Sequence, residues 1–236
     1  MRLDRLLANL GVASRSGCRE LIAKGRVAVD GKTAKSGAEQ VTDNACVTVD
    51  GQTLDTRLER HLMLYKPSGI LTAAEDGKQQ TVMELLPDLY RACGCMPIGR
   101  LDKDTTGILL FTTDGELAHR LIAPQHHVDK VYEAQVDGKL DETDKDAFAG
   151  GIAFKDFTAM PAKLEILSPD TARVTVQEGK YHQVKRMFAS RGKPVVRLHR
   201  ASFGSLRLDP VMKPGDFREL TQAEADELYR EAGINR

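Results

Sequence analysis

The 236-residue chain contains no tryptophan and only four cysteines, and aromatic residues make up 5% of it. Four cysteines are too few for a disulfide scaffold, and Cys93 and Cys95 form a Cys-x-Cys rather than the Cys-x-x-Cys pair of common zinc sites. No stretch reaches the roughly 18 apolar residues of a membrane span, and residues 1–5 lack the apolar run of a secretion signal. We therefore expect a cytoplasmic protein with free thiols and no membrane segment.

The chain also lacks net charge, because 34 basic and 34 acidic residues give a formal total of +0. These charges are unevenly distributed: residues 1–26 hold six basic and two acidic side chains, and residues 173–207 hold nine basic and one acidic. Phosphate groups respond to the local field, since the Debye length is about 8 Å at physiological salt. A neutral total therefore does not exclude a nucleic-acid partner, although solvated faces also collect charge and each basic segment alone is modest evidence.

The first segment predicts two short helices followed by strands. Leucines at 3, 6, 7 and 10 lie on one helical face, and Ser14 is a suitable N-cap for a second helix over residues 15–24. Residues 27–31 and 47–51 both read Val-x-Val-Asp-Gly, a pattern that predicts two hairpins. The polar stretch 52–60 that follows is a candidate linker.

The remainder of the chain alternates predicted strands and helices. We expect strands over 61–65, 130–136, 173–176 and 195–199, and helices over 116–123, 141–149 and 181–190, the last with Lys185 and Arg186 in its middle. Thr221 and Glu224 form a capping-box pattern that begins a C-terminal helix. The sequence therefore predicts an α+β protein with a small basic domain over residues 1–58 and a larger domain over 59–236.

The segment 99–107 concentrates the most polar chemistry of the chain. It reads GRLDKDTTG and leads directly into the apolar run 108–111, which predicts a tight polar loop before a buried strand. Loops held by rigid elements often carry catalytic groups, but Asp, Thr and Gly are also ordinary turn formers. Composition alone favours the ordinary turn, so the other motifs decide.

Several segments together resemble a known family. Residues 2–32 resemble an S4 RNA-binding domain, and residues 98–111, with Gly-Arg-Leu-Asp followed by Thr-Gly-Ile-Leu, resemble the catalytic motif of pseudouridine synthases. Residues 130–132 resemble the tyrosine motif of that family, and residues 179–187 resemble its basic motif. Residues 66–69 match its Lys-Pro-x-Gly motif. Four motifs in the right order over nearly the whole chain identify it as an RsuA-like member. One departure is Tyr181-His182-Gln183 where the family often has Asn-Arg-Gln, which leaves the roles of the first two residues open.

The resemblance implies an S4-type domain followed by a pseudouridine synthase fold, whose mixed, mostly antiparallel sheet is flanked by helices. It implies isomerisation of a specific uridine to pseudouridine in small-subunit (16S) ribosomal RNA, either as RNA or in an assembling small-subunit particle. We expect a monomer, because the sequence shows no coiled coil and no long apolar surface stripe. This reaction involves no redox change or hydrolysis, so no cofactor or metal is expected, and the chain shows no Gly-x-Gly-x-x-Gly, P-loop or zinc-like spacing. The same reaction on large-subunit rRNA and a non-catalytic RNA-binding role in ribosome assembly remain alternatives.

The resemblance also implies roles for individual residues. Asp102 is the catalytic carboxylate, which attacks a sugar or base carbon or stabilises positive charge on the ribose. Lys185 keeps that carboxylate ionised, and Tyr132 stacks on the uracil. The expected RNA contacts are Arg100, which holds the flipped nucleotide, and Arg186, Arg5, Arg15, Arg19, Lys24 and Arg26, which contact phosphates.

Each of these residues also has an ordinary structural interpretation. Without its motif, Lys185 is a solvated lysine on a helix face and Tyr132 is a core aromatic whose hydroxyl finds a partner. Asp104, two residues after Asp102, is interpreted from its position as a turn or capping group.

Overall fold

The computed structural model describes residues 1–42 and 44–235, which form two compact units. One unit comprises residues 1–60 and 86–96, and the other comprises the remaining described residues. The sequence did not indicate that residues 86–96 pack with the N-terminal unit. The division into domains over 1–58 and 59–236 stays a prediction. No helix in the described part of the chain is long and apolar enough to cross a membrane.

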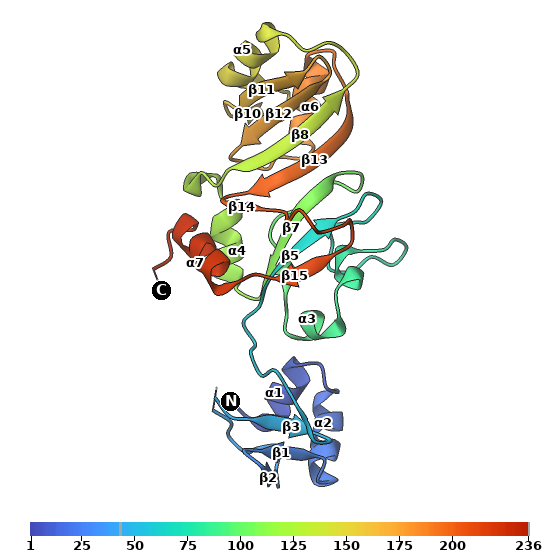
Figure 1. The fold of residues 1–236 in the computed structure, drawn as a ribbon, viewed down its shortest axis with the longest axis vertical. Coiled ribbons are helices and arrows are strands. Elements are labelled where there is room, and N and C mark those ends of the chain that lie inside the picture. The colour runs from blue at the N-terminus through green and yellow to red at the C-terminus, as the bar shows by residue number, and fades with distance from the viewer. Residues whose placement is uncertain (43, 236) are drawn as a thin grey trace. The chain divides into compact units, whose positions relative to one another are not determined.

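The N-terminal unit contains α1 (Leu3–Asn9) and α2 (Arg15–Ala23) beside a small antiparallel sheet (Figure 1). It also includes α3 (Asp88–Ala92), whose Leu89 packs against the core of this unit. The sheet has the order β2-β1-β3-β4, with β1 (Val27–Val29), β2 (Lys32–Thr33), β3 (Val47–Val49) and β4 (Gln52–Thr53). Both predicted hairpins are confirmed, and their Asp-Gly turns have positive φ at both positions, as a type I′ turn requires. Ser14 caps α2 by accepting a hydrogen bond from the Gly17 amide at 3.2 Å.

The predicted linker 52–60 is partly wrong. It begins with β4, which pairs with β3, and it ends at Arg60, whose side chain is buried and donates a hydrogen bond to Asp55 at 2.9 Å. The polar composition of this stretch therefore reflects an edge strand and an internal ion pair as well as solvent exposure.

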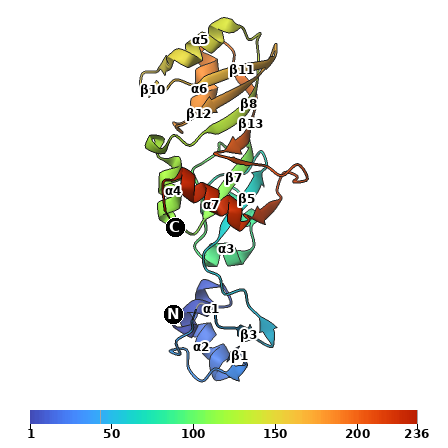
Figure 2. The same ribbon diagram turned by 60° about the vertical axis from the view of Figure 1, so that its left-hand side comes forward.

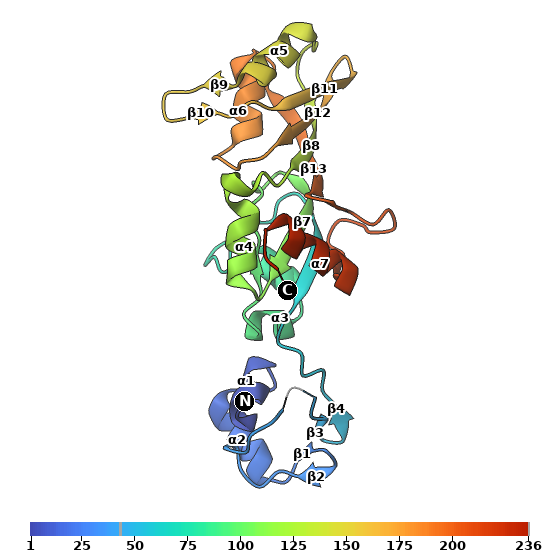
Figure 3. The ribbon, with the colours of Figure 1, turned by 90° about the vertical axis from the view of Figure 1, so that its left-hand side faces the viewer.

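The second unit is built on one long mixed sheet. Its strand order is β11-β12-β8-β13-β7-β5-β15, and every neighbouring pair is antiparallel except β13 and β7. The strands are β5 (His61–Lys66), β7 (Thr106–Thr112), β8 (Lys130–Val136), β11 (Lys163–Ser168), β12 (Thr171–Val176), β13 (Val195–Phe203) and β15 (Phe217–Glu219). Short strands complete the chain: β6 (Met96–Pro97), the hairpin of β9 (Ile152–Ala153) and β10 (Thr158–Ala159) seen beside α6 in Figure 3, and β14 (Leu206–Arg207). This sheet confirms the predicted α+β class.

Two pairs of helices cover this sheet. α5 (Glu142–Gly150) and α6 (Gln183–Ser190) pack on its β8–β11–β12 part, where Phe148 and Phe188 join the core. α4 (Gly115–Ile122) and α7 (Gln222–Glu231) pack on the β5–β7 part, where Leu117 and Tyr229 are buried (Figure 2). Two 3-10 turns, η1 (Val82–Leu85) and η2 (Pro124–His126), lie in the connections.

Helix α6 begins two residues later than the sequence predicts. His182 has a left-handed backbone, with φ at 51°, and it is the N-cap of the helix. A left-handed residue cannot be part of a right-handed helix, so Tyr181 and His182 form a turn that precedes it. Lys185 and Arg186 consequently lie in the first turn of α6 and not in its middle.

The parallel contact between β7 and β13 depends on Gly107. This glycine has φ of +113°, and a Cβ atom added to it would lie 2.2 Å from the carbonyl oxygen of Arg200. Only glycine allows this close approach of the two backbones. The polar loop 99–105 therefore ends where the two antiparallel halves of the sheet join.

Candidate active site

Lys66, at the end of β5, fastens the polar loop before β7. The side chain is fully buried, and Nζ donates hydrogen bonds to the carbonyl oxygens of Lys103 and Thr105 at 3.1 and 3.0 Å. Burial lowers the pKa of Lys66 to about 8, although the charges of Asp104 and Asp102 act in the opposite direction. The backbone on the C-terminal side of Asp102 is thus held by a single buried amine.

Asp102 lies at the centre of this loop with its side chain 27% exposed. Thr72 holds the preceding residue, because its hydroxyl donates to the Leu101 carbonyl at 2.9 Å and accepts from the Leu101 amide at 3.2 Å. Lys185 Nζ lies 3.0 Å from Asp102 Oδ2, and His182 Nε2 lies 3.4 Å from Oδ1. The carboxylate is therefore aimed by α6 while its backbone is fixed by the neighbouring loop.

Lys185 is shared by two carboxylates. Its Nζ lies 2.5 Å from Asp104 Oδ1 as well as 3.0 Å from Asp102 Oδ2. Partial burial alone would lower the pKa of Lys185, but the hydrogen bonds with Asp104 and Asp102 outweigh burial and raise it. Asp104 is 72% exposed, and Lys185 lowers its pKa. This ion pair is a role that the place of Asp104 in the turn did not indicate.

A cavity of about 740 Å³ opens beside Asp102, within the range of about 300–1,000 Å³ typical of ligand sites. Tyr132, from the middle of β8, and the exposed side chain of Arg100 also line it. A smaller adjoining pocket adds Lys185 to these three residues. The structure thus brings together Asp102, Tyr132, Lys185 and Arg100 from a loop, a strand and a helix.

Two buried cations line the same cavity and were not singled out from the sequence. Burial, reinforced by the charge of Arg200, lowers the pKa of Lys130 to about 8. Arg200 lies across from Tyr132 in the β8–β13 register, and its Nε donates to the Ile108 carbonyl at 2.8 Å. Its Nη2 is buried and has no hydrogen-bond partner among the residues that the structure describes. Both cations make the cavity wall positive, which favours an anionic or carbonyl-rich ligand.

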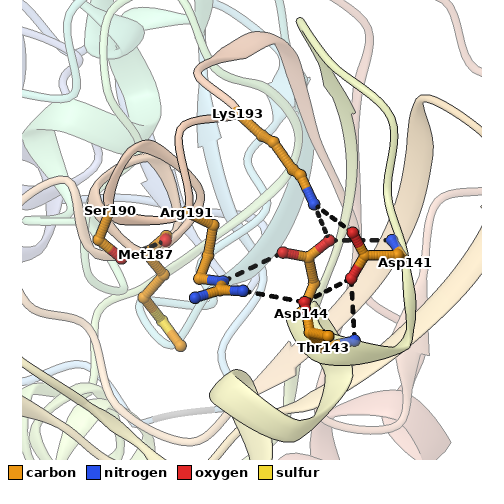
Figure 4. Close-up of polar contacts among 7 residues, drawn as sticks. All are labelled: Asp141, Thr143, Asp144, Met187, Ser190, Arg191 and Lys193. Carbon is orange, nitrogen blue, oxygen red and sulfur yellow. Dashed lines mark hydrogen bonds and ion pairs between the residues drawn. The ribbon is translucent and has the colours of Figure 1, made fainter.

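An ion network fixes the other end of α6, as Figure 4 shows. Asp144 of α5 is fully buried and accepts hydrogen bonds from Arg191 Nε at 3.1 Å and from Lys193 Nζ. The same carboxylate accepts from the Asp141 amide at 3.0 Å in the capping box of α5. Burial opposes ionisation of Asp144, but Lys193 and the other donors outweigh it and lower its pKa. The helix that carries Lys185 is therefore tied directly to the start of α5.

Arg186, an expected phosphate contact, has protein partners instead. Its two terminal nitrogens lie 2.9 and 2.5 Å from the carboxylate oxygens of Asp156. Its guanidinium also lies 4.6 Å from the ring centroids of Phe154 and Phe157, at distances typical of cation–π contacts. A contact between Arg186 and RNA stays a prediction.

In the N-terminal unit, four of the five expected RNA-contacting side chains are in ion pairs. The fully buried carboxylate of Asp4 lies 3.5 Å from Arg15 and 2.8 Å from Arg19, whose side chains are about half exposed. Hydrogen bonds from Arg2 and Arg19 hold the pKa of Asp4 well below its usual range. The remaining pairs are Lys24 with Glu20 at 2.6 Å and Arg26 with Asp50 at 2.5 Å, while Arg5 is exposed. Asp4 thus holds the guanidinium groups of Arg15 and Arg19 in place, while about half of each side chain stays exposed to solvent.

The structure provides no obvious metal ligand set in the part of the chain that it describes. Among residues 1–42 and 44–235, no three His, Cys, Asp or Glu side chains are grouped so that they can hold a metal ion. The four cysteines form no disulfide.

Comparison with known proteins agrees with this geometry. Residues 60–190 match the family described as RNA pseudouridylate synthase, and residues 1–47 match the S4 domain. The chain is 44% identical over 230 residues to the uncharacterized RNA pseudouridine synthase YtzG of Bacillus subtilis, and the match covers 95% of this chain and 96% of that protein. It is 42% identical over 228 residues to ribosomal small subunit pseudouridine synthase A of Pseudomonas aeruginosa, covering 95% and 98%.

A solved structure extends the similarity to the fold. The crystal structure of a pseudouridylate synthase matches 97% of this chain and 99% of that chain, with 35% identity and a TM-score of 0.68. Sequence and fold therefore agree over nearly the whole length. The chain belongs to the RNA pseudouridylate synthase family and is an RNA pseudouridine synthase with an S4 domain.

Proposed function

We propose that this enzyme isomerises a specific uridine of small-subunit (16S) ribosomal RNA to pseudouridine, with Asp102 as the catalytic carboxylate. The observation that carries the proposal is the position of Asp102, whose carboxylate faces a cavity and lies 3.0 Å from Lys185 Nζ. The substrate is supported by the similarity to a protein named ribosomal small subunit pseudouridine synthase A.

The reaction moves one bond and conserves all atoms. The C1′–N1 bond of the uridine breaks, the uracil turns, and a bond forms between C1′ and C5. The proton on C5 leaves, and N1 gains a proton. An ionised carboxylate at this point can attack a sugar or base carbon, or it can stabilise positive charge on the ribose. Lys185 places a positive charge 3.0 Å from Asp102 Oδ2 and holds the carboxylate in position.

Tyr132 and Arg100 hold the nucleotide in this proposal. Tyr132 lines the cavity beside Asp102 and stacks on the uracil, and Arg100 stands at the exposed rim, where it occupies the place of the flipped nucleotide. Flipping a base out of the stack costs roughly a few kcal/mol. Stacking of the planar Arg100 guanidinium in the vacated place offsets part of this cost.

The S4 domain positions the enzyme on folded RNA. Arg15 and Arg19, held by Asp4, present fixed donors to phosphates, while Lys24, Arg26 and Arg5 add charge nearby. We infer that the enzyme acts in the cytoplasm as a monomer. The absence of any disulfide among its four cysteines is consistent with a reducing compartment.

Mapping of pseudouridine in rRNA tests the proposal. Cells without this protein should lose one pseudouridine in small-subunit rRNA, and the wild-type gene should restore it. Asp102→Asn should lower the rate on that RNA by at least about 10³-fold without weakening RNA binding. Asp104→Asn is the matched control, because Asp104 pairs with the same lysine but does not line the cavity, and its loss should stay within about tenfold.

The outcomes separate the parts of the proposal. Loss of a site in large-subunit rRNA would show that the substrate is wrong while the enzyme class is right. An Asp102→Asn enzyme with activity within about tenfold of wild type would refute the catalytic assignment.

A further inference from the structure

An exposed aromatic stack stands at the mouth of the catalytic cavity. Tyr181 and His182 both line the cavity, and the Tyr181 side chain is 76% exposed. Their rings stack in parallel, with centroids 3.9 Å apart and planes inclined by 18°. The Tyr181 hydroxyl makes no hydrogen bond to any described residue. The ring therefore has one face packed on histidine, and among the described residues no hydrogen bond or further ring contact fixes its orientation.

The stack is held in place from the inside. His182 has a left-handed backbone, with φ at 51°, at the start of α6, and its Nε2 lies 3.4 Å from Asp102 Oδ1. A ring that is fixed before its partner arrives loses little conformational entropy on binding. Tyr181 is thus preorganised as the outer layer of a stack that ends at the catalytic carboxylate.

The surroundings fit an RNA strand. Lys180 precedes Tyr181 in the chain, Lys180, Lys103 and Arg100 all line the same cavity, and all three have exposed side chains. Cations that follow the backbone, combined with aromatic faces for the bases, are the usual elements of single-strand recognition. A nucleic-acid strand supplies both the phosphates and the flat apolar faces that such a surface binds.

We propose that Tyr181 is the stacking platform for the nucleobase next to the target uridine, and that it helps to determine which uridine is modified. This inference rests on the proposed function, because it needs a uridine in the cavity beside Asp102. With the uracil inside, the strand must leave across the rim, where Tyr181 and Lys180 lie. A neighbouring base on Tyr181 extends the Tyr181–His182 stack, so the same contact that selects the sequence also presses His182 towards Asp102.

The test uses the full-length enzyme and small-subunit rRNA in which the base beside the mapped uridine can be removed. A synthetic segment with an abasic nucleotide on the 5′ or the 3′ side is ligated into the transcript. On intact RNA, Tyr181→Ala should lower kcat/KM by about 5- to 150-fold through KM, which is the fold-change expected for one lost base stack. Tyr181→Phe should recover most of that loss, because it keeps the ring and removes only the hydroxyl.

The abasic RNA gives the decisive comparison. Removal of the stacked base should weaken the wild type and should make Tyr181→Ala and the wild type equal on that RNA. Val211→Ala is the matched control. Val211 lies in the same unit and is 80% exposed, but it does not line the cavity. The Val211→Ala enzyme should therefore behave as the wild type on every RNA.

Two results would overturn the inference. One is a Tyr181→Ala enzyme that equals the wild type on intact RNA, and the other is a defect that persists undiminished on both abasic RNAs. A wild-type enzyme that modifies no uridine of small-subunit rRNA would overturn the proposed function as well, so the two failures are distinguishable.

Discussion

Asp102 and Asp104 show how two carboxylates in one loop acquire different surroundings. Both lie within hydrogen-bond distance of Lys185, yet Asp102 is 27% exposed and lines the cavity, whereas Asp104 is 72% exposed and does not. The interaction of Asp104 with Lys185 is therefore largely screened by water, whereas in our proposal that of Asp102 acts where charge develops during the reaction. Replacing Lys185 removes the cation from both carboxylates.

Replacing Lys185 with glutamine should lower kcat with little change in stability. The pKa of Lys185 is raised in the folded enzyme, so the lysine is charged at neutral pH and its loss removes a cation from beside Asp102. We expect a fall in kcat of roughly 10²-fold or more, from single-turnover rates, and a partial recovery in Lys185→Arg.

Lys145→Gln is the control for this change. Lys145 forms a similar ion pair, with Glu142 at 2.7 Å, on a helix that does not line the cavity. If Lys185→Gln and Lys145→Gln lower kcat to the same small extent, Lys185 is only a surface cation.

At the scale of elements, the sequence predicts most helices and strands because their ends carry local signals. Ser14 and Thr221 each cap the helix that the pattern assigned to them, and Asp141, expected as the first residue of a helix, is its N-cap. The predicted start of α6 was wrong because His182 has a left-handed backbone, which its residue type does not specify. The motif resemblance predicted that this helix contains Lys185. The ion pairs of Asp144 in α5 with Arg191 and Lys193 join residues distant in sequence, so neither segment alone predicts them.

That anchoring predicts that Asp144→Asn destabilises the enzyme. Asp144 is buried against Arg191 and Lys193 (Figure 4), and removing one charge from a buried pair costs about 3 kcal/mol when the partners are partly exposed. Because the pKa of Asp144 is lowered on folding, its contribution is fully present above its ordinary value of 3.8 and is lost as pH falls towards the lowered value.

Urea unfolding at several pH values measures this contribution. The difference in the free energy of unfolding between wild type and Asp144→Asn should be largest near neutral pH and should shrink below about pH 4. Asp146→Asn, exposed on the same helix, should show no such pH dependence. A difference that stays constant down to about pH 2 would mean that the ionised form of Asp144 is not what stabilises the fold.

At the scale of the whole molecule, the motifs predict residues that the structure brings together, but they do not indicate that residues 86–96 pack with the N-terminal unit. The predicted partners Asp102, Tyr132 and Lys185 line adjoining pockets, although they are far apart in the sequence. Lys130 and Arg200 were missed because a buried cation looks like any other basic residue in a sequence. Residues 86–96 were missed because their packing with the N-terminal unit is a long-range contact, in which Leu89 lies against the core of that unit.

Removing residues 1–58 should therefore have two separable effects. RNA affinity should fall and its salt dependence should weaken, because each lost phosphate contact lowers the slope of log K against log[salt] by about 0.7–0.9. The remaining chain should still fold, but Leu89 loses its core and becomes exposed, so aggregation should increase unless Leu89→Ser is added. In the full-length chain, the double change Arg5→Gln and Lys24→Gln should reproduce part of the slope change with a normal melting temperature, because Arg5 is exposed and Lys24 pairs with the exposed Glu20. A truncated chain that cannot fold even with Leu89→Ser would contradict the division into two domains, and an unchanged salt slope would contradict phosphate binding by the S4 domain.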